Sequence, residues 1–207
     1  MRKALVEGLG TFFLVLTIGL TVIEPGAGAM APVAIGAMLM VMVYAGGPIS
    51  GGHYNPAVTL AVWLRGKCPT KDVPAYVVAQ VAGALAAAAV VGFCKRGSVV
   101  MPLTPQALPA LLVETVLTFA LAFVVLQVAT STRSAGNSYF GLAIGATVTA
   151  SAYAAGHISG GVFNPAVAVG ITAMGLSAPS SLWIFLVGNL AGGALAALVF
   201  RVTNPDD

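Results

Sequence analysis

Charged side chains are scarce in this sequence: they make up 7% of its 207 residues, against roughly a quarter in ordinary soluble domains. Because so few charged residues cannot cover a water-facing surface, most of the outer surface must face lipid. Cysteine is also rare, and Cys68 and Cys94 flank a single apolar segment. If that segment crosses a bilayer, the two thiols lie on opposite sides and stay unpaired.

Several classes of function lack the residues they would need. No basic stripe interleaved with aromatics is present, so we expect no nucleic-acid partner. No Ser-His-Asp arrangement and no metal-ligand spacing occur, so we expect neither an enzyme nor a metal or other cofactor. Met1, Arg2 and Lys3 lead into an apolar run without a cleavage site, which predicts a retained first helix rather than a signal peptide.

Apolar runs dominate what is present, and they predict an all-α membrane protein. A span needs roughly 20 mostly apolar residues. Six segments qualify, at about 4–23, 30–47, 73–93, 108–128, 139–155 and 181–201. Two apolar stretches, 55–64 and 164–175, are too short to cross and are interpreted as re-entrant half-helices.

The basic residues predict the orientation of the chain. Cytoplasmic segments of membrane proteins carry an excess of Lys and Arg. With six spans and the N-terminus inside, the cytoplasmic side holds Arg2, Lys3, Arg65, Lys67, Lys71, Arg133 and Arg201. Only Lys95 and Arg96 then lie outside. We therefore predict a multi-pass protein of the cell membrane with both termini in the cytoplasm.

The chain repeats itself. Residues 47–58 align with 156–167, and both stretches contain Ile-Ser-Gly-Gly and Asn-Pro-Ala-Val. Glu7 aligns with Glu114, and each is followed by Thr-Phe at the same spacing. Each half holds three spans, an odd number, so the halves must run in opposite directions. We predict one domain, residues 1–207, built as an inverted repeat of about 1–97 and 106–204, with its special site near the midplane.

Each half carries an Asn-Pro-Ala box: Asn55, Pro56 and Ala57, then Asn164, Pro165 and Ala166. Asparagine is a preferred helix N-cap, and proline suits the first helical turn. Inverted symmetry brings the two helix N-termini face to face, and each carries about half a positive charge. Two such ends oppose a cation, while the spare asparagine N–H groups can donate to a passing oxygen.

Two Asn-Pro-Ala boxes on half-helices in inverted halves resemble the major intrinsic proteins, the aquaporins and aquaglyceroporins. The resemblance covers nearly the whole chain and implies a passive channel for water and small uncharged solutes, assembled as a homotetramer. It also implies that Glu7 and Glu114 bind the backbone of the pore loops, which fits the need of a membrane-buried carboxylate for a partner. The alternative is that both merely lie near the interface.

Two further polar residues have pore-related positions. Gln80 lies in residues 79–84, which are similar to the family's third helix, and is expected to be structural. His53 precedes Asn55 by two positions, where relatives often have a histidine beside the pore. It either ties loop backbone together or contacts the lumen, or does both.

The family's outer selectivity filter falls on Ile35, Ala152, Gly161 and Val167. Most relatives place an arginine directly after the second box, where this chain has Val167. The resemblance therefore implies a wide, apolar filter that passes ammonia, urea, glycerol or hydrogen peroxide. Tyr44 or Tyr153 could narrow it by turning into the pore.

Other classes of function stay open on the sequence alone. Inverted repeats also occur in alternating-access transporters, although these spans hold few polar side chains to bind a substrate. A closed pore with a structural or adhesion role is a further alternative, as is a solute channel with little water flux.

Overall fold

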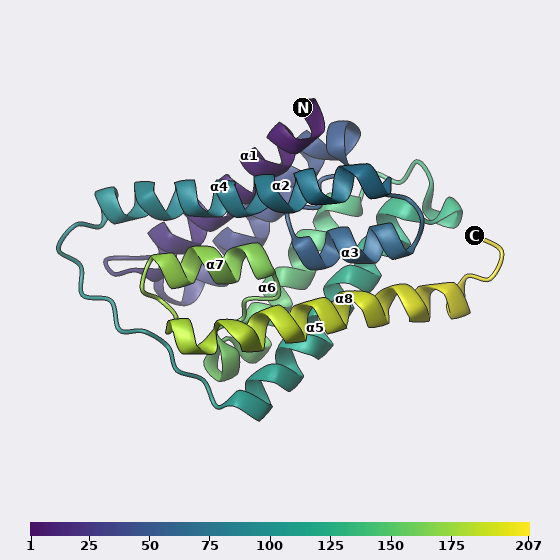
Figure 1. Cartoon of the computed structure of the whole chain (residues 1–207). Coiled ribbons are helices and arrows are strands. Elements are labelled where there is room, and N and C mark those ends of the chain that lie inside the picture. Colours follow the sequence, from purple (N-terminus) through teal and green to yellow (C-terminus); the bar gives the residue numbers. More distant parts are fainter.

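The computed structural model describes residues 1–207 as six long helices and two short ones, joined by loops and single turns of 3₁₀ helix (Figure 1). No β-strand is present, apart from an isolated bridge between Leu103 and Ser177. The helices are α1 (Arg2–Val22), α2 (Ala31–Ser50), α3 (Pro56–Leu64), α4 (Val73–Cys94), α5 (Ala107–Thr130), α6 (Phe140–Ser159), α7 (Pro165–Ala173) and α8 (Leu182–Thr203). The six predicted spans and two half-helices are confirmed.

Five of the long helices, α1, α2, α4, α5 and α8, are long and apolar enough to cross a membrane by composition alone. The other predicted span, α6, is not among these five. It has the same length as α2, 20 residues, but it includes Thr147, Thr149, Ser151 and His157. Its polar side chains lower its average hydropathy, while its position in the bundle mirrors that of α2.

The contacts between helices repeat when the two halves of the chain are exchanged. Helix α1 packs on α2 and α4, and α5 packs correspondingly on α6 and α8. The long helices α2 and α6 pack on each other, α3 packs on α8, and α7 packs on α4. Figure 1 shows α3 and α7 end to end between α4 and α8. The short helices therefore meet in the interior of the bundle.

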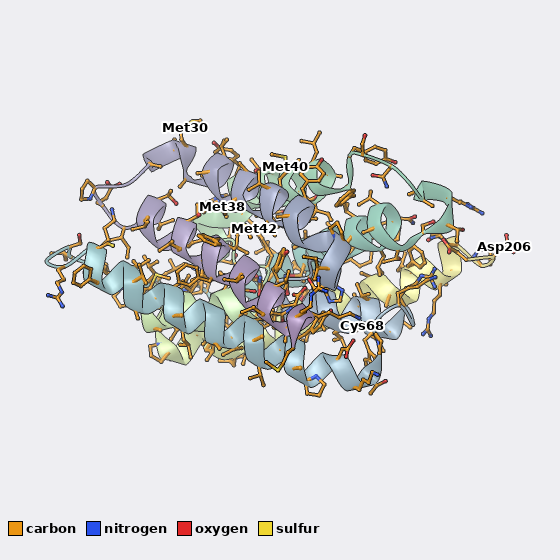
Figure 2. All side chains as sticks on the ribbon, turned by 90° about the horizontal axis from the view of Figure 1, so that it is seen from above. Met30, Met38, Met40, Met42, Cys68 and Asp206 are labelled. Carbon is orange, nitrogen blue, oxygen red and sulfur yellow. The ribbon has the colours of Figure 1, made fainter.

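The two halves run in opposite directions. Contacts of Lys3 with Asp72 and of Arg65 with Asp207 gather at the end of the bundle that carries both termini. At the other end, the loop before α5 joins the loop before α8, because the Leu103 N–H donates to the Leu176 carbonyl. In Figure 2, Met30 lies toward this second end, while Cys68 and Asp206 lie toward the end with the termini. Cys68 and Cys94 are both free thiols.

Helices α2 and α6 extend beyond the expected ends of their spans. Helix α2 ends at Ser50 instead of residue 47, and α6 ends at Ser159 instead of residue 155. Gly46, Gly47 and Pro48 do not stop α2; Pro48 lies inside its last turn, and the helix runs on to Ser50. It ends at Gly51, whose φ of 96° is left-handed, and α6 ends in the same way at Gly160 with φ 95°. Glycine adopts this conformation without steric cost, which makes it the usual helix terminator.

Glycines allow α2 and α6 to cross closely. A Cβ atom at Gly145 would lie 2.4 Å from the Gly36 carbonyl oxygen and 2.7 Å from the Met40 Cβ. Gly36 faces α6 in the same way, since its Cβ would meet the Gly145 oxygen at 2.5 Å. The backbones are therefore in direct contact where the two halves meet.

We expect Gly145→Ala to destabilise the protein, because an added methyl group must push the α2 backbone away. Overpacking of this kind costs about 1–3 kcal/mol. The matched control is Gly92→Ala in α4, where an added Cβ meets nothing within 4 Å and the change should stabilise the helix by about 0.5–1 kcal/mol. The midpoint of thermal unfolding in detergent, followed by circular dichroism, should fall in Gly145→Ala and rise in Gly92→Ala. Equal midpoints would contradict the close crossing.

Candidate functional site: two capped half-helices and the cavities beside them

Asn55 and Asn164 begin the two short helices. The Asn55 Oδ1 accepts from the Ala57 N–H at 2.8 Å and more weakly from the Val58 N–H at 3.4 Å. The Asn164 Oδ1 makes the equivalent bonds to residues 166 and 167, at 2.9 and 3.3 Å. Pro56 and Pro165 occupy the first helical turn, where no N–H is needed. The side chains thus satisfy the free donors at each helix start.

The same asparagines also join the two halves. The Asn55 Nδ2 donates to the Phe163 carbonyl at 2.8 Å, and the Asn164 Nδ2 donates to the Tyr54 carbonyl at 2.9 Å. An amide nitrogen carries two hydrogens, so one N–H of each asparagine is used across the junction and one is left over. The two helix N-termini are therefore held together by a reciprocal pair of hydrogen bonds.

Tyr54 and Phe163, directly before these asparagines, have left-handed backbones, with φ of 50° and 49°. This conformation is uncommon for bulky residues and is strained. Both side chains are nearly fully buried, at 0% and 1% exposure, which holds them in place. The strained conformation turns each carbonyl toward the asparagine of the other half.

Glu7 fixes the loop before α3. Its Oε1 accepts from the Ser50 hydroxyl at 2.7 Å and the His53 N–H at 3.0 Å. Its Oε2 accepts from the Tyr54 N–H at 2.6 Å and the Gln80 amide at 2.8 Å. The Glu7 side chain is fully buried, and these four donors replace the water that a carboxylate loses inside the protein.

Glu114 repeats this arrangement in the second half. Its Oε1 accepts from the Ser159 hydroxyl at 2.6 Å and the Val162 N–H at 2.9 Å. Its Oε2 accepts from the Phe163 N–H and the Asn189 amide, each at 2.7 Å. Glu114 is also fully buried. Each carboxylate therefore anchors the strained residue that precedes the Asn-Pro-Ala box.

Asn189, in α8, was missed by the sequence analysis. It occupies the place that Gln80 occupies in the first half, and each amide also donates to a threonine hydroxyl at 3.0 Å, Thr118 and Thr59 respectively. A signal was present, because Asn189 follows Glu114 by nearly the spacing that separates Gln80 from Glu7. The shorter side chain hid the equivalence.

His53 combines a loop contact with a place at the cavity wall. Its Nδ1 lies 3.1 Å from the Thr59 hydroxyl oxygen, and its ring packs edge-on against Tyr76. The Thr59 hydroxyl lies 3.0 Å from the Asn55 carbonyl, to which it donates. Because the Thr59 hydroxyl uses its proton toward Asn55, its oxygen accepts the hydrogen bond from a protonated Nδ1. The Nε2 is then unprotonated and free to accept a hydrogen bond.

A cavity of about 400 Å³, called here the filter cavity, runs between α1, α2, α5 and α6 to the two asparagines. Most of its lining residues are apolar. Six residues named from the sequence line it together with His53: Ile35, Asn55, Ala152, Gly161, Asn164 and Val167. No charged side chain lines it. The side chains of Glu7, Gln80 and Glu114 stay behind the loops and do not reach it.

The remaining box residues lie away from this cavity. Ala57 and Ala166 are fully buried, and Pro56 and Pro165 line a separate apolar groove between α4 and α8. Tyr44 and Tyr153 do not turn into the pore. The Tyr44 hydroxyl donates to the Ser138 carbonyl, and the Tyr153 hydroxyl donates to the Ala29 carbonyl.

A second cavity of about 440 Å³, called here the terminal cavity, opens at the end of the bundle that carries both termini. Its lining includes Lys3, Lys67 and Cys68, and it shares His53 and Val125 with the filter cavity. The two cavities therefore lie on either side of His53.

The fold and this site define a multi-pass membrane protein whose two half-helices meet beside a cavity inside the bundle. The sequence matches the family model described as Major intrinsic protein over residues 1–200. The chain belongs to the major intrinsic protein family.

Individual relatives agree with this assignment. Aquaporin NIP1-4 of Oryza sativa subsp. japonica is 38% identical, over 98% of this chain and 77% of the relative. Glycerol uptake facilitator protein-like 6 of Lactiplantibacillus plantarum is 37% identical over the full length of both chains. The solved structure of the aquaglyceroporin from Plasmodium falciparum has a similar fold, with a TM-score of 0.82, 20% identity, and coverage of 99% of this chain and 97% of that one.

Proposed function

We propose that this chain is a passive channel for water and small uncharged solutes, and that the filter and terminal cavities form its conduction path. The observation that carries the proposal is the apolar filter cavity that ends on the amides of Asn55 and Asn164. Each asparagine has one N–H left over after the junction is made. These two groups can donate to the oxygen of a passing water or alcohol without binding it tightly.

Ile35, Ala152, Gly161 and Val167 act as the selectivity filter in this proposal. An apolar ring without a fixed charge excludes solutes by size rather than by hydrogen bonding. A Cβ at Gly161 would lie 3.3 Å from the Ala152 Cα, so the small residues at these two positions keep the ring open. Glycerol and urea are therefore expected to pass, in keeping with the glycerol uptake named for the Lactiplantibacillus plantarum relative.

The paired half-helices oppose cations at the junction. Each helix N-terminus carries about half a positive charge, and both face the same point between Asn55 and Asn164. A water molecule there accepts from the asparagine amides and is oriented so that its own hydrogens point away. This orientation disfavours proton transfer along a water file.

The surroundings of the channel complete the proposal. The whole chain, residues 1–207, acts as one channel domain with inverted halves of about 1–97 and 106–204, and no chemical step occurs in it. The basic residues at the end with the termini favour a cytoplasmic location for that end in the cell membrane. We propose a homotetramer with one path in each subunit, an assembly taken from the family resemblance.

Swelling of proteoliposomes tests the proposed function. Vesicles containing the chain should swell in isotonic glycerol or urea, and should shrink in sucrose, at least tenfold faster than empty vesicles. Permeation of water alone would contradict the wide filter. Saturable, ion-dependent uptake would indicate alternating access, and rates equal to those of empty vesicles would indicate a closed structural pore.

A further inference from the structure

Fixed charge is distributed unevenly along the two cavities. The filter cavity has no charged side chain in its lining, whereas Lys3 and Lys67 line the terminal cavity. No acidic side chain lines the terminal cavity. A solute that crosses the protein by this path meets charged side chains at one mouth only, on the far side of His53 from the filter cavity.

The two lysines differ in how far their charge is compensated. The Lys3 Nζ lies 3.4 Å from the Asp72 Oδ2, in an ion pair between partly exposed side chains. Lys67 has no salt bridge; the chain's only other ion pair is that of Arg65 with Asp207. Burial raises the pKa of the Cys68 thiol, so this neighbour stays neutral near pH 7 and does not offset the lysine.

Helix ends of both signs lie at the mouth of the terminal cavity. Helix α2 ends at Ser50, and the last turn of α5 contributes Ala129 and Thr130 to the terminal cavity. Each helix C-terminus carries about half a negative charge. The N-terminus of α1, whose first turn contributes Lys3 to the lining, carries about half a positive charge at the same mouth, so the helix ends offset one another in part. The unit charge of Lys67 is larger than any of these half charges.

We propose that Lys67, assisted by Lys3, adds to the exclusion of cations at the half-helix junction by making the terminal cavity electropositive. The filter around Val167 has no charge and does not discriminate against cations. The lysine charge at the opposite mouth provides this discrimination. This inference rests on the proposed function, because it assumes that the terminal cavity belongs to the conduction path.

The expected effect is moderate and depends on salt. For an assumed separation of about 8 Å in water-like surroundings, a unit charge changes the local cation concentration about two- to threefold. The Debye length is about 30 Å at 0.01 M salt and about 3 Å at 1 M. The contribution of Lys67 should therefore be largest in dilute buffer and should vanish in concentrated salt.

Urea and guanidinium form a suitable pair of probes, because both are small and planar and differ chiefly in charge. We would measure the uptake of radiolabelled urea and guanidinium into proteoliposomes whose membrane potential is held near zero with potassium and valinomycin. Lys67→Gln should raise the ratio of guanidinium to urea uptake about two- to threefold at low salt. Lys67→Glu, which reverses the charge, should raise it about sixfold.

Lys71→Gln is the matched control, because Lys71 is exposed, has no salt bridge, and does not line the cavity. It removes the same charge from a position farther from the cavity and should raise the ratio clearly less than Lys67→Gln does. An unchanged ratio in both Lys67 variants, an equal rise in Lys71→Gln, or an effect that persists at 1 M salt would overturn the inference. Urea uptake reports on the proposed function separately: its absence in every protein would contradict that function, whereas normal urea uptake with an unchanged ratio would contradict only the role of Lys67.

Discussion

Solute flux is expected to fall at least tenfold when Glu114 is replaced by glutamine. The substitution keeps the size of the side chain but replaces one acceptor oxygen by an NH₂ group. In either orientation that group faces a backbone N–H that donates to the carboxylate, that of Val162 at 2.9 Å or that of Phe163 at 2.7 Å. Leaving a buried donor without an acceptor costs about 1–3 kcal/mol, and Phe163 holds a strained backbone that depends on these bonds.

The loss should reach the conduction path because Phe163 leads directly into the second box. Its carbonyl accepts from Asn55, and Asn164 follows it. When the loop relaxes, both asparagine amides lose their positions at the end of the filter cavity. We expect the thermal midpoint in detergent and the urea flux in vesicles to fall together.

Glu24→Gln is the matched control for this prediction. The Glu24 carboxylate is exposed and lies in a loop, where it accepts from the Gly26 N–H at 2.7 Å. Water can replace that bond, so neither stability nor flux should change. Full flux and an unchanged midpoint in Glu114→Gln would contradict the anchoring role and would favour a carboxylate that merely lies near the interface.

Ala152→Phe is expected to reduce glycerol and urea flux at least tenfold while the protein still folds. Ala152 lines the filter cavity from α6, and the backbone of Gly161 faces it across the ring. A phenyl ring placed here enters a cavity of only about 400 Å³ and takes up space that the solutes need. Water should be reduced less than glycerol, because water is the smallest of the three solutes.

The matched control for the filter is Ala154→Phe. Ala154 lies two residues further along the same helix, but its side chain is exposed on the outside of the bundle. The same ring there should contact lipid and leave every flux unchanged. Equal losses in the two variants would indicate a general disturbance of α6, and unchanged glycerol flux in Ala152→Phe would remove this residue from the filter.

The helices could be predicted because their apolar character is a local property of the sequence. The run that became α5 needs no partner to be recognised, and the repeated boxes at Asn55 and Asn164 indicated where the short helices begin. Helix ends were less accurate: Pro48 suggested a break, yet α2 continues to Ser50 with this proline inside its last turn. The left-handed glycine marks the true end.

The contacts between the halves could not be predicted from the sequence. The asparagines were expected to offer their free N–H groups to a solute, but one N–H of each binds the carbonyl of Phe163 or Tyr54 across the junction. That bond depends on left-handed backbones at two aromatic residues, which sequence patterns disfavour. Asn189 was missed for a related reason, since its role depends on its distance to Glu114 in space.

The central claim is that uncharged solutes pass beside the two asparagines where the half-helices meet. A crystallographic map of the chain in lipid that resolves ordered water tests this directly. We predict a file of water oxygens that runs from the filter cavity past His53 to the terminal cavity, with one oxygen within about 3 Å of both Asn55 Nδ2 and Asn164 Nδ2. A file that stops before the asparagines, with side chains closing the space between the two cavities, would contradict it.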